Sequence, residues 1–152
     1  MKTGKGVNRL EITRDPSNDE IELVYAGLSH YNSKKTQGMM KDSRKEIFLT
    51  LKDNQGGVMG GIFCFSVLNN LNIQILWIDE RYRRMGYGKN LVLEAEKIAK
   101  ENGCISSQTF SYSFQAPEFY QKLGYEIFGV IEDYPLGIKK FFLRKKFQSL
   151  IV

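Results

Sequence analysis

The chain has 152 residues, which is the length of one domain. Apolar residues make up 42% of the sequence and charged residues 26%, values that are ordinary for a globular protein. This composition excludes a disordered chain, a collagen and a coiled coil. The sequence has no run of about 18 apolar residues, so we expect no membrane-spanning helix.

Charge and cysteine content bound the partners and the compartment. The formal net charge of +5 favours anionic partners only weakly. Residues 1–8 carry lysines with no apolar stretch behind them, which predicts a loose tail rather than a secretory signal. Cys64 and Cys104 are too few for a disulfide framework, and neither has a Cys or His nearby at metal-ligand spacing. We therefore expect one metal-free domain over residues 1–152, in the cytoplasm.

The first third of the chain predicts one well-defined helix. Leu10 to Thr13 has the pattern of a short strand. Ser17 and Glu20 then form a capping box that opens a helix. The apolar face of this helix is formed by Ile21, Val24, Leu28 and Tyr31. The polar stretch over 33–43 predicts a loop or a short second helix.

Three strands are predicted next, over 47–51, 58–67 and 71–78. Gly60 and Gly61 lie inside the second of them and indicate a bulge or a close approach of two backbones. The end of the third strand is apolar on both faces, which is typical of a central strand.

The second half alternates helices and strands. The sequence predicts a long amphipathic helix over 86–102, a strand over 104–110 and a short helix that begins at Pro117 and ends at Gly124. Two last strands are predicted over 125–131 and 138–144. This order of elements indicates a mixed α/β domain.

Residues 83–89, Arg-Arg-Met-Gly-Tyr-Gly-Lys, separate the most apolar strand from the most amphipathic helix. A helix N-terminus offers unpaired amide donors and a partial positive charge. Glycines let a phosphate approach the backbone, and arginines add charge-assisted hydrogen bonds to its oxygens. The stretch is therefore a candidate pyrophosphate site, although glycines before a helix also arise from turn chemistry alone.

Two familiar phosphate loops do not fit these residues. The dinucleotide fingerprint needs a third small residue where Leu91 stands. The nucleoside triphosphate loop needs Ser or Thr where Asn90 stands, and glycine where Arg83 stands.

Arg83-x-x-Gly86-x-Gly88, after an apolar strand and before an amphipathic helix, resembles the acetyl-CoA motif of the GNAT superfamily of N-acyltransferases. A second stretch, residues 116–125 (Ala-Pro-Glu-Phe-Tyr-Gln-Lys-Leu-Gly-Tyr), resembles the family's Ala-x-x-Phe-Tyr-x-x-x-Gly-Phe segment. The two matches lie in the family's order and at its interval.

The resemblance implies a mostly antiparallel, twisted α/β (α+β) sheet with helices on both faces. Its fourth and fifth predicted strands, over 71–78 and 104–110, would run parallel and splay apart around acetyl-CoA. Ser113 stands where many members carry the Asn that binds pantetheine, with Gln115 nearby. The cofactor contacts that the resemblance implies are Leu76, Trp77, Ile78, Arg83, Arg84, Met85, Gly86, Tyr87, Gly88, Lys89, Ser113 and Gln115.

The implied activity is acetyl-CoA-dependent N-acetyl transfer to a primary amine of a small molecule or peptide, by direct attack on the thioester. Tyr120 matches the family position that often supplies the acid for the departing thiolate, and it is otherwise a core aromatic. Some members carry a carboxylate base on the fourth strand, where this chain has Asn72 and Gln74. The base is therefore left unassigned.

Two other interpretations stay open. A non-catalytic CoA-binding sensor or interaction domain would use the same fold, since a fold does not fix its chemistry. A basic nucleic-acid binder is the least favoured, because no predicted helix carries a long basic face. We expect acetyl-CoA and an amine acceptor as partners and no membrane, and we leave the acceptor and the oligomeric state, a homodimer included, undecided.

Overall fold

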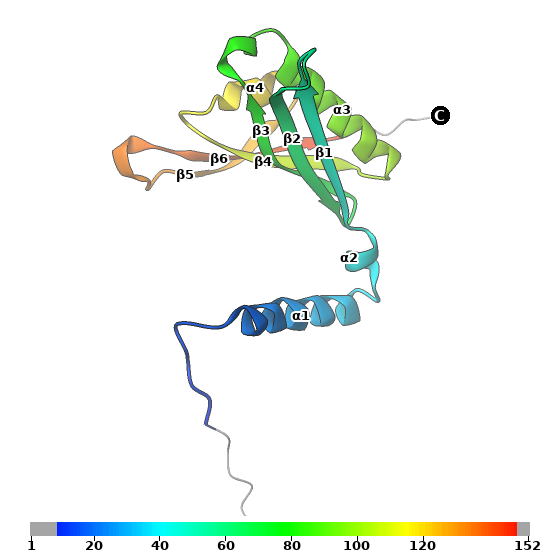
Figure 1. Ribbon diagram of the computed structural model, residues 1–152, viewed down its shortest axis with the longest axis vertical. Helices are drawn as coiled ribbons and strands as arrows, with labels where there is room; N and C mark the ends of the chain where they lie inside the picture. The colour runs from blue at the N-terminus through cyan, green and yellow to red at the C-terminus, as the bar shows by residue number, and fades with distance from the viewer. Residues whose placement is uncertain (1–8, 149–152) are drawn as a thin grey trace, which may run out of the picture.

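The computed structural model describes residues 9–148 and has two parts, a six-stranded sheet with its helices and a projecting N-terminal helix (Figure 1). The predicted tail over 1–8 lies outside the described residues. In chain order the elements are α1 (Asn18–Lys35), α2 (Met39–Asp42), β1 (Lys45–Lys52), β2 (Val58–Val67), β3 (Asn70–Ile78), η1 (Glu80–Tyr82), α3 (Tyr87–Glu101), β4 (Ser106–Tyr112), α4 (Pro117–Lys122), β5 (Glu126–Ile131), η2 (Pro135–Gly137) and β6 (Lys140–Lys146).

The strands lie in the order β1-β2-β3-β4-β6-β5. Every neighbouring pair is antiparallel except β3 and β4, which run parallel. The predicted mixed α/β class, with a parallel pair inside a mostly antiparallel sheet, is confirmed. Among the described helices, none is both long and apolar enough to cross a membrane.

The core lies between one face of the sheet and α3. Every third or fourth residue of α3 turns toward the sheet, and Val92 is completely buried there. From the sheet, Ile62 of β2 and Leu143 of β6 are equally inaccessible to solvent. The short helix α4 packs on the same face, where Tyr120 contacts the ring of Tyr125 with 5.4 Å between centroids.

The N-terminal helix does not lie on the sheet (Figure 1). Its predicted capping box is present: the Ser17 hydroxyl accepts from the Glu20 amide at 3.3 Å, and the Glu20 carboxylate accepts from the Ser17 amide at 2.6 Å. Among the described residues, however, no side chain of α1 is buried. The resemblance implied helices on both faces of the sheet, and α1, the helix available for the second face, stands away from it.

The strand predicted over Leu10–Thr13 is wrong. These residues adopt no strand in the structure, and Leu10 and Ile12 are almost fully exposed. A short apolar alternation satisfies the pattern of a strand, but a strand also needs a neighbouring sheet edge to pair with. The described part of this chain offers none to this segment.

One buried polar network ties α3 to the sheet. Glu96 of α3 is 1% exposed, and its carboxylate accepts hydrogen bonds from Lys145 Nζ of β6 at 2.8 Å and from the Tyr125 hydroxyl at 2.9 Å. The same hydroxyl lies 2.8 Å from Ser107 Oγ of β4. The network therefore fixes the rotation of α3 relative to β4 and β6, because a buried carboxylate requires its partners.

We expect Lys145→Ala to lower the free energy of unfolding by about 3–5 kcal/mol, since it leaves the Glu96 carboxylate buried without its cation. Lys146→Ala is the matched control, because Lys146 follows directly and is exposed. Urea unfolding of both variants measures the difference. Equal stabilities would show that this ion pair does not hold the helix.

Candidate active site

The parallel strands β3 and β4 part from each other soon after they begin. They pair at three positions only, and the last is Asn72 opposite Gln108, whose side chains are hydrogen-bonded to each other. One step further, Thr109 Oγ1 lies 3.2 Å from the carbonyl of Ile73. Beyond this point the strands diverge around a cavity of about 1010 Å³. The predicted splay of these two strands is therefore present.

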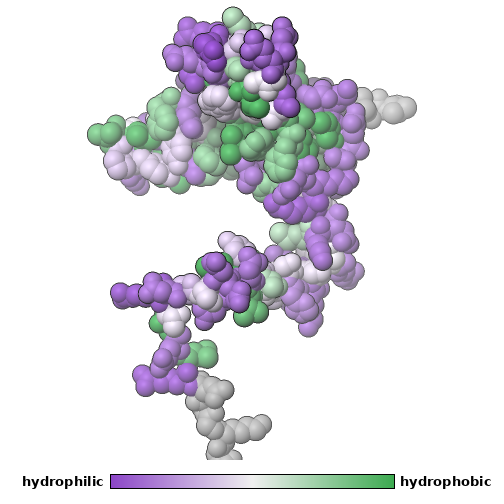
Figure 2. All heavy atoms as spheres, viewed as in Figure 1, coloured by the Kyte–Doolittle hydropathy of each residue, from purple (hydrophilic) through white to green (hydrophobic). Residues whose placement is uncertain are grey.

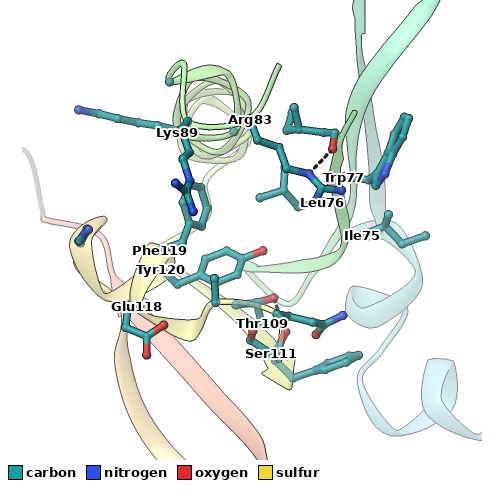
Figure 3. A pocket seen from close by; sticks show the side chains of 18 of the residues that line it. Ile75, Leu76, Trp77, Arg83, Lys89, Thr109, Ser111, Glu118, Phe119 and Tyr120 are labelled. Carbon is teal, nitrogen blue, oxygen red and sulfur yellow. Dashed lines mark hydrogen bonds between the residues drawn. The ribbon is translucent and has the colours of Figure 1, made fainter. Parts of the chain in front are cut away.

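Four segments form the walls of this cavity (Figure 3). One wall is the end of β3, over 74–78, and the opposite wall is β4, over 109–111. The loop and first turn of α3 supply Arg83, Gly86 and their neighbours, and α4 closes the far side. The cavity therefore opens where a strand end, a helix N-terminus and a second helix meet.

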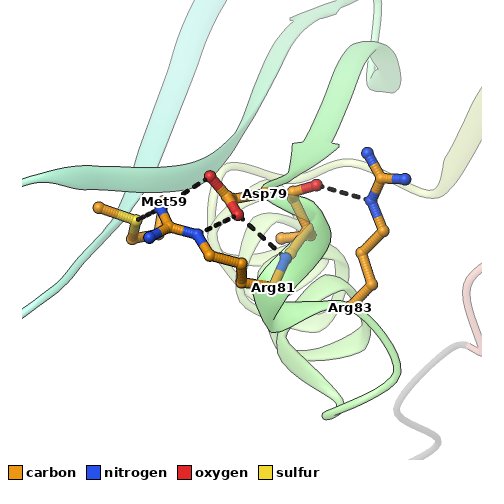
Figure 4. Close-up of polar contacts among 5 residues, drawn as sticks. Met59, Asp79, Arg81 and Arg83 are labelled. Atoms are coloured by element: carbon orange, nitrogen blue, oxygen red, sulfur yellow. Dashed lines mark hydrogen bonds and ion pairs between the residues drawn. The ribbon is translucent and has the colours of Figure 1, made fainter.

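The turn after β3 is stabilised by Asp79, whose carboxylate caps η1 by accepting from the Arg81 amide at 3.0 Å. Arg81 Nε also donates to this carboxylate at 2.9 Å, and this contact lowers the pKa of Asp79 to about 2. Arg81 extends toward Met59, away from Arg83 (Figure 4). Asp79 thus caps the turn, and its carboxylate is held there by Arg81.

Arg83 takes the opposite direction and lines the cavity (Figure 4). Its Nε donates to the carbonyl of Ile78 at 2.9 Å, which fixes the base of the side chain against the end of β3. A permanent positive charge therefore stands beside the first turn of α3.

The N-terminus of α3 is built to leave its amides available. Arg84 and Gly86 both have positive φ, 61° and 86°, so the backbone curls into the helix without a capping side chain. The first turn of α3 carries no acidic residue either. Since the first amides of a helix have no partner inside the helix, they point their hydrogens at whatever lies in front of them. With Arg83 beside it, this arrangement is suited to an anion such as a phosphate.

Tyr120 of α4 stands at the other end of the cavity. Figure 3 shows its hydroxyl between Leu76 of β3 and Thr109 of β4. The residue is 8% exposed, and burial raises the pKa of Tyr120 to about 12, which the hydrogen bond with the Thr109 side chain offsets only in part. At neutral pH the hydroxyl keeps its proton and is able to donate it.

The cavity brings together most of the residues that the sequence singled out. Those that line it are Leu76, Trp77, Ile78, Arg83, Arg84, Gly86, Gly88, Lys89, Gln115 and Tyr120. Met85, Tyr87 and Ser113 are not among the lining residues, and the Ser113 hydroxyl accepts instead from the Lys139 amide at 3.1 Å.

Sequence reasoning missed several lining residues, among them Thr109, Phe119 and Phe114. Thr109 lies on the same buried face of β4 as Ser107, two residues earlier. A polar residue repeated at every second position of a strand was the signal in the sequence that could have found it. Phe119 lies opposite Gly88, where an added Cβ would come within 3.4 Å of its ring. Nothing in the pattern of residues predicted the position of Phe114.

Neither cysteine belongs to this cavity. Cys64 is fully buried, and burial raises the pKa of its thiol to about 12. Burial likewise raises the pKa of Cys104. Within residues 9–148, no group of three or more His, Cys, Asp or Glu side chains is placed to hold a metal ion.

Comparison with known proteins agrees with this geometry. Residues 7–125 match the Acetyltransferase (GNAT) family. The chain belongs to the GNAT family of acetyltransferases. It is therefore an acyltransferase of the N-acetyltransferase type.

Three relatives illustrate the range of similarity to this GNAT chain. A blasticidin-S acetyltransferase of Streptomyces morookaense is 40% identical over 93 residues, which are 60% of this chain and 68% of the relative. The crystal structure of an acetyltransferase from Bacillus cereus is 36% identical, with a TM-score of 0.81 over 90% of this chain and 98% of that one. The PaiA N-acetyltransferase of Thermoplasma acidophilum, solved with coenzyme A, shares the fold at 23% identity, with a TM-score of 0.56 over 83% of this chain and 79% of its own.

Proposed function

We propose that this GNAT protein transfers an acetyl group from acetyl-CoA to a primary amine of a small molecule or peptide, by direct attack of the amine on the thioester. One observation carries the proposal. A single cavity has an uncapped helix N-terminus beside Arg83 at one end and the protonated hydroxyl of Tyr120 at the other. The first suits a diphosphate, and the second suits a departing thiolate.

The cavity walls suit the parts of acetyl-CoA in sequence. The amides at the start of α3, over 84–89, would accept the pyrophosphate. Beyond Asn72, β3 has no strand partner on the side of β4 within the described residues, so its backbone at Leu76, Trp77 and Ile78 would pair with the amides of pantetheine. Gln115 also lines this path, although its side chain accepts from the Tyr112 amide.

The chemistry needs three proton transfers, two from the amine nitrogen and one to the departing thiolate. An alkyl ammonium has a pKa of roughly 10, so the acceptor must first lose a proton. We assign this proton to water, because β3 presents Gln74 and no carboxylate to the cavity, and the carboxylate of Glu118 in α4, which also lines the cavity, points away from the Tyr120 hydroxyl (Figure 3). The amine nitrogen then bonds to the thioester carbon, and an amide at the end of β3 stabilises the oxyanion. When the carbon–sulfur bond breaks, Tyr120 gives its proton to the coenzyme thiolate, and the former amine nitrogen loses its remaining extra proton to water as the amide forms. A proton from solvent then restores the Tyr120 hydroxyl.

Burial of both cysteines favours this direct route over a covalent acyl-enzyme. A thiol attacks as its thiolate, and the raised pKa of Cys64 disfavours that form. Neither thiol lines the cavity. The amine itself is therefore the nucleophile.

The relative that acetylates blasticidin S makes that compound the first acceptor to test. We expect purified protein to release coenzyme A from acetyl-CoA in the presence of at least one amine from a panel of blasticidin S, a polyamine, an amino acid and a peptide with a free N-terminus. Mass spectrometry of the product would show one added acetyl group. Saturable binding of acetyl-CoA with no acetylated product from any amine would favour the sensor interpretation instead.

Arg83→Ala is expected to weaken acetyl-CoA binding by about 1.5–3 kcal/mol, or roughly 10- to 100-fold in Kd, because a charge-assisted hydrogen bond is lost. Arg81→Ala is the matched control, since Arg81 pairs with Asp79 outside the cavity. Isothermal titration calorimetry measures both. Equal affinities would remove Arg83 from the binding site.

Tyr120→Phe is expected to lower kcat by about 100-fold or more, with little change in the Kd of acetyl-CoA, because it removes the acid and leaves the ring in place. Tyr134→Phe serves as control, since Tyr134 packs on Tyr112 and does not line the cavity. Because the pKa of Tyr120 is about 12, wild-type kcat should show no loss of the acid between about pH 7 and 10. Unchanged turnover in the Phe variant would mean that another group protonates the thiolate.

A further inference from the structure

Helix α1 presents an apolar face with nothing on it. Its large apolar side chains, with exposures between 39% and 74%, are Ile21, Leu23, Val24, Tyr25, Leu28 and Tyr31. All but Leu23 fall on one side of the helix, at the i, i+3, i+4 spacing of a face that packs against another element. Among the described residues, α1 has 18 residues and no buried side chain. An isolated helix of this length is only marginally stable in water, so packing of its apolar face against another surface would stabilise it.

The sheet has a matching bare face, on the side opposite α3. Its large apolar side chains, with exposures between 38% and 59%, are Phe48, Phe63, Ile75, Trp77 and Phe110. They share one face because Phe63 pairs with both Phe48 and Ile75 across the strands. Figure 2 shows a hollow between α1 and this side of the sheet, with hydrophobic residues gathered over the sheet.

The two apolar faces look toward each other across this hollow. Tyr25 and Leu28 of α1 line a cavity of about 460 Å³ together with Phe65 and Val67 of β2. The space between helix and sheet is therefore lined from both sides near the joint that connects them.

The joint that holds α1 away from the sheet is well ordered by hydrogen bonds. The Thr36 hydroxyl donates to the Asn32 carbonyl at 2.8 Å and accepts from the Met40 amide at 3.2 Å, so one side chain links α1 to α2. The Ser43 hydroxyl then links α2 to the sheet by accepting from the Leu68 amide at 2.9 Å. Closing α1 onto its own sheet would break these contacts.

The segment that holds α1 is also matched in a solved relative. Residues from β1 to the end of the chain are only about seven tenths of the 152 residues, whereas the Bacillus cereus structure matches 90% of them with a TM-score of 0.81. The match therefore includes much of the segment that precedes β1.

We propose that the hollow is filled by α1 of a second copy of this chain, in a two-fold dimer in which each copy lays its α1 on the bare sheet face of the other. A second copy supplies both missing surfaces at once, because the same symmetry operation that covers one sheet covers one helix in return. Any other partner would have to provide an apolar helix and an apolar receptor together.

Size and charge also favour a second copy. A stable interface buries roughly 1,600 Å² in total, and two contacts between a sheet and a helix about 27 Å long are of that order. The first turn of α1 carries Asp19 and Glu20. The bare face carries Arg44 over the ring of Phe65, at 4.3 Å, and Lys140 over the ring of Phe110, at 4.0 Å.

This dimer also completes the active site, a step that rests on the proposed function. Ile75, Trp77 and Phe110 belong to the bare face and line the large cavity as well. The partner's α1, lying over these side chains, would cover the open side of the cavity where the amine enters. Each acceptor site would then be formed by two chains.

The test measures mass in solution and then breaks one face at a time. Sedimentation should give wild-type protein twice the mass of one chain. Leu28→Glu should raise the dimer dissociation constant by roughly 30-fold or more, because it places a charge in an apolar contact. His30→Glu, an exposed position on the other side of the same helix, should leave it unchanged. Circular dichroism checks that both variants are folded.

A mixing experiment separates exchange between chains from closure within one chain. Phe63→Glu breaks the sheet face, and Leu28→Glu breaks the helix face. In an exchanged pair, one chain of each variant forms one intact helix-on-sheet contact, so mixing two monomeric variants should restore a dimer. A monomeric wild type, a dimer that Leu28→Glu leaves intact, or a mixture that stays monomeric would each overturn the proposal.

The effect on the reaction is a separate readout. Leu28→Glu should raise the KM for the amine roughly 10-fold and leave the Kd of acetyl-CoA within about 2-fold of wild type, because the partner's α1 would cover the side of the cavity where the amine enters and not the start of α3. If the wild type were a dimer without transferase activity, the proposed function would fail and the dimer would stand. If kinetics were normal in a monomer, the reverse would hold.

Discussion

The separation of β3 and β4 after three residue pairs is the constraint on which the rest of the structure depends. Parallel neighbours normally continue to share hydrogen bonds, so their parting exposes backbone donors and acceptors that need other partners. Within the chain, the Thr109 hydroxyl donates to the carbonyl of Ile73, and Arg83 Nε donates to the carbonyl of Ile78. The remaining positions along this edge are available to an extended ligand with amide groups of its own.

A gap in a sheet is stable only if the elements around it are held from outside. The Glu96, Lys145 and Tyr125 network does this by fastening α3 to β6 and to the residue directly before β5. Tyr125 also packs on Tyr120, so the same network sets the depth at which the proposed acid lies. Close approach of β2 to β3 at Gly60, where an added Cβ would lie 2.8 Å from the Trp77 carbonyl, holds the other side.

The sequence was informative where local chemistry decides the structure. The capping box of α1, the glycine at the start of α3 and the apolar periods of β2 and α3 depend on neighbours within a few residues, and all were predictable. Leu10–Thr13 was wrong because pairing depends on a distant edge. The position of α1 was equally out of reach, since an amphipathic pattern predicts that a face is covered but not which surface covers it. Thr109 and Phe114 entered the cavity through tertiary packing.

The burial of Cys64 and Cys104 has a practical consequence for assays that detect free thiols. Aromatic disulfide reagents release a coloured thiolate when an accessible protein or ligand thiolate attacks them. The two cysteines of the folded chain are buried and would react slowly with such a reagent. In an assay of the proposed reaction, coenzyme A would be the only thiol that reacts quickly. The release of coenzyme A could therefore be followed continuously by absorbance. A slow, late rise in absorbance would instead show that the protein is unfolding and exposing its own cysteines.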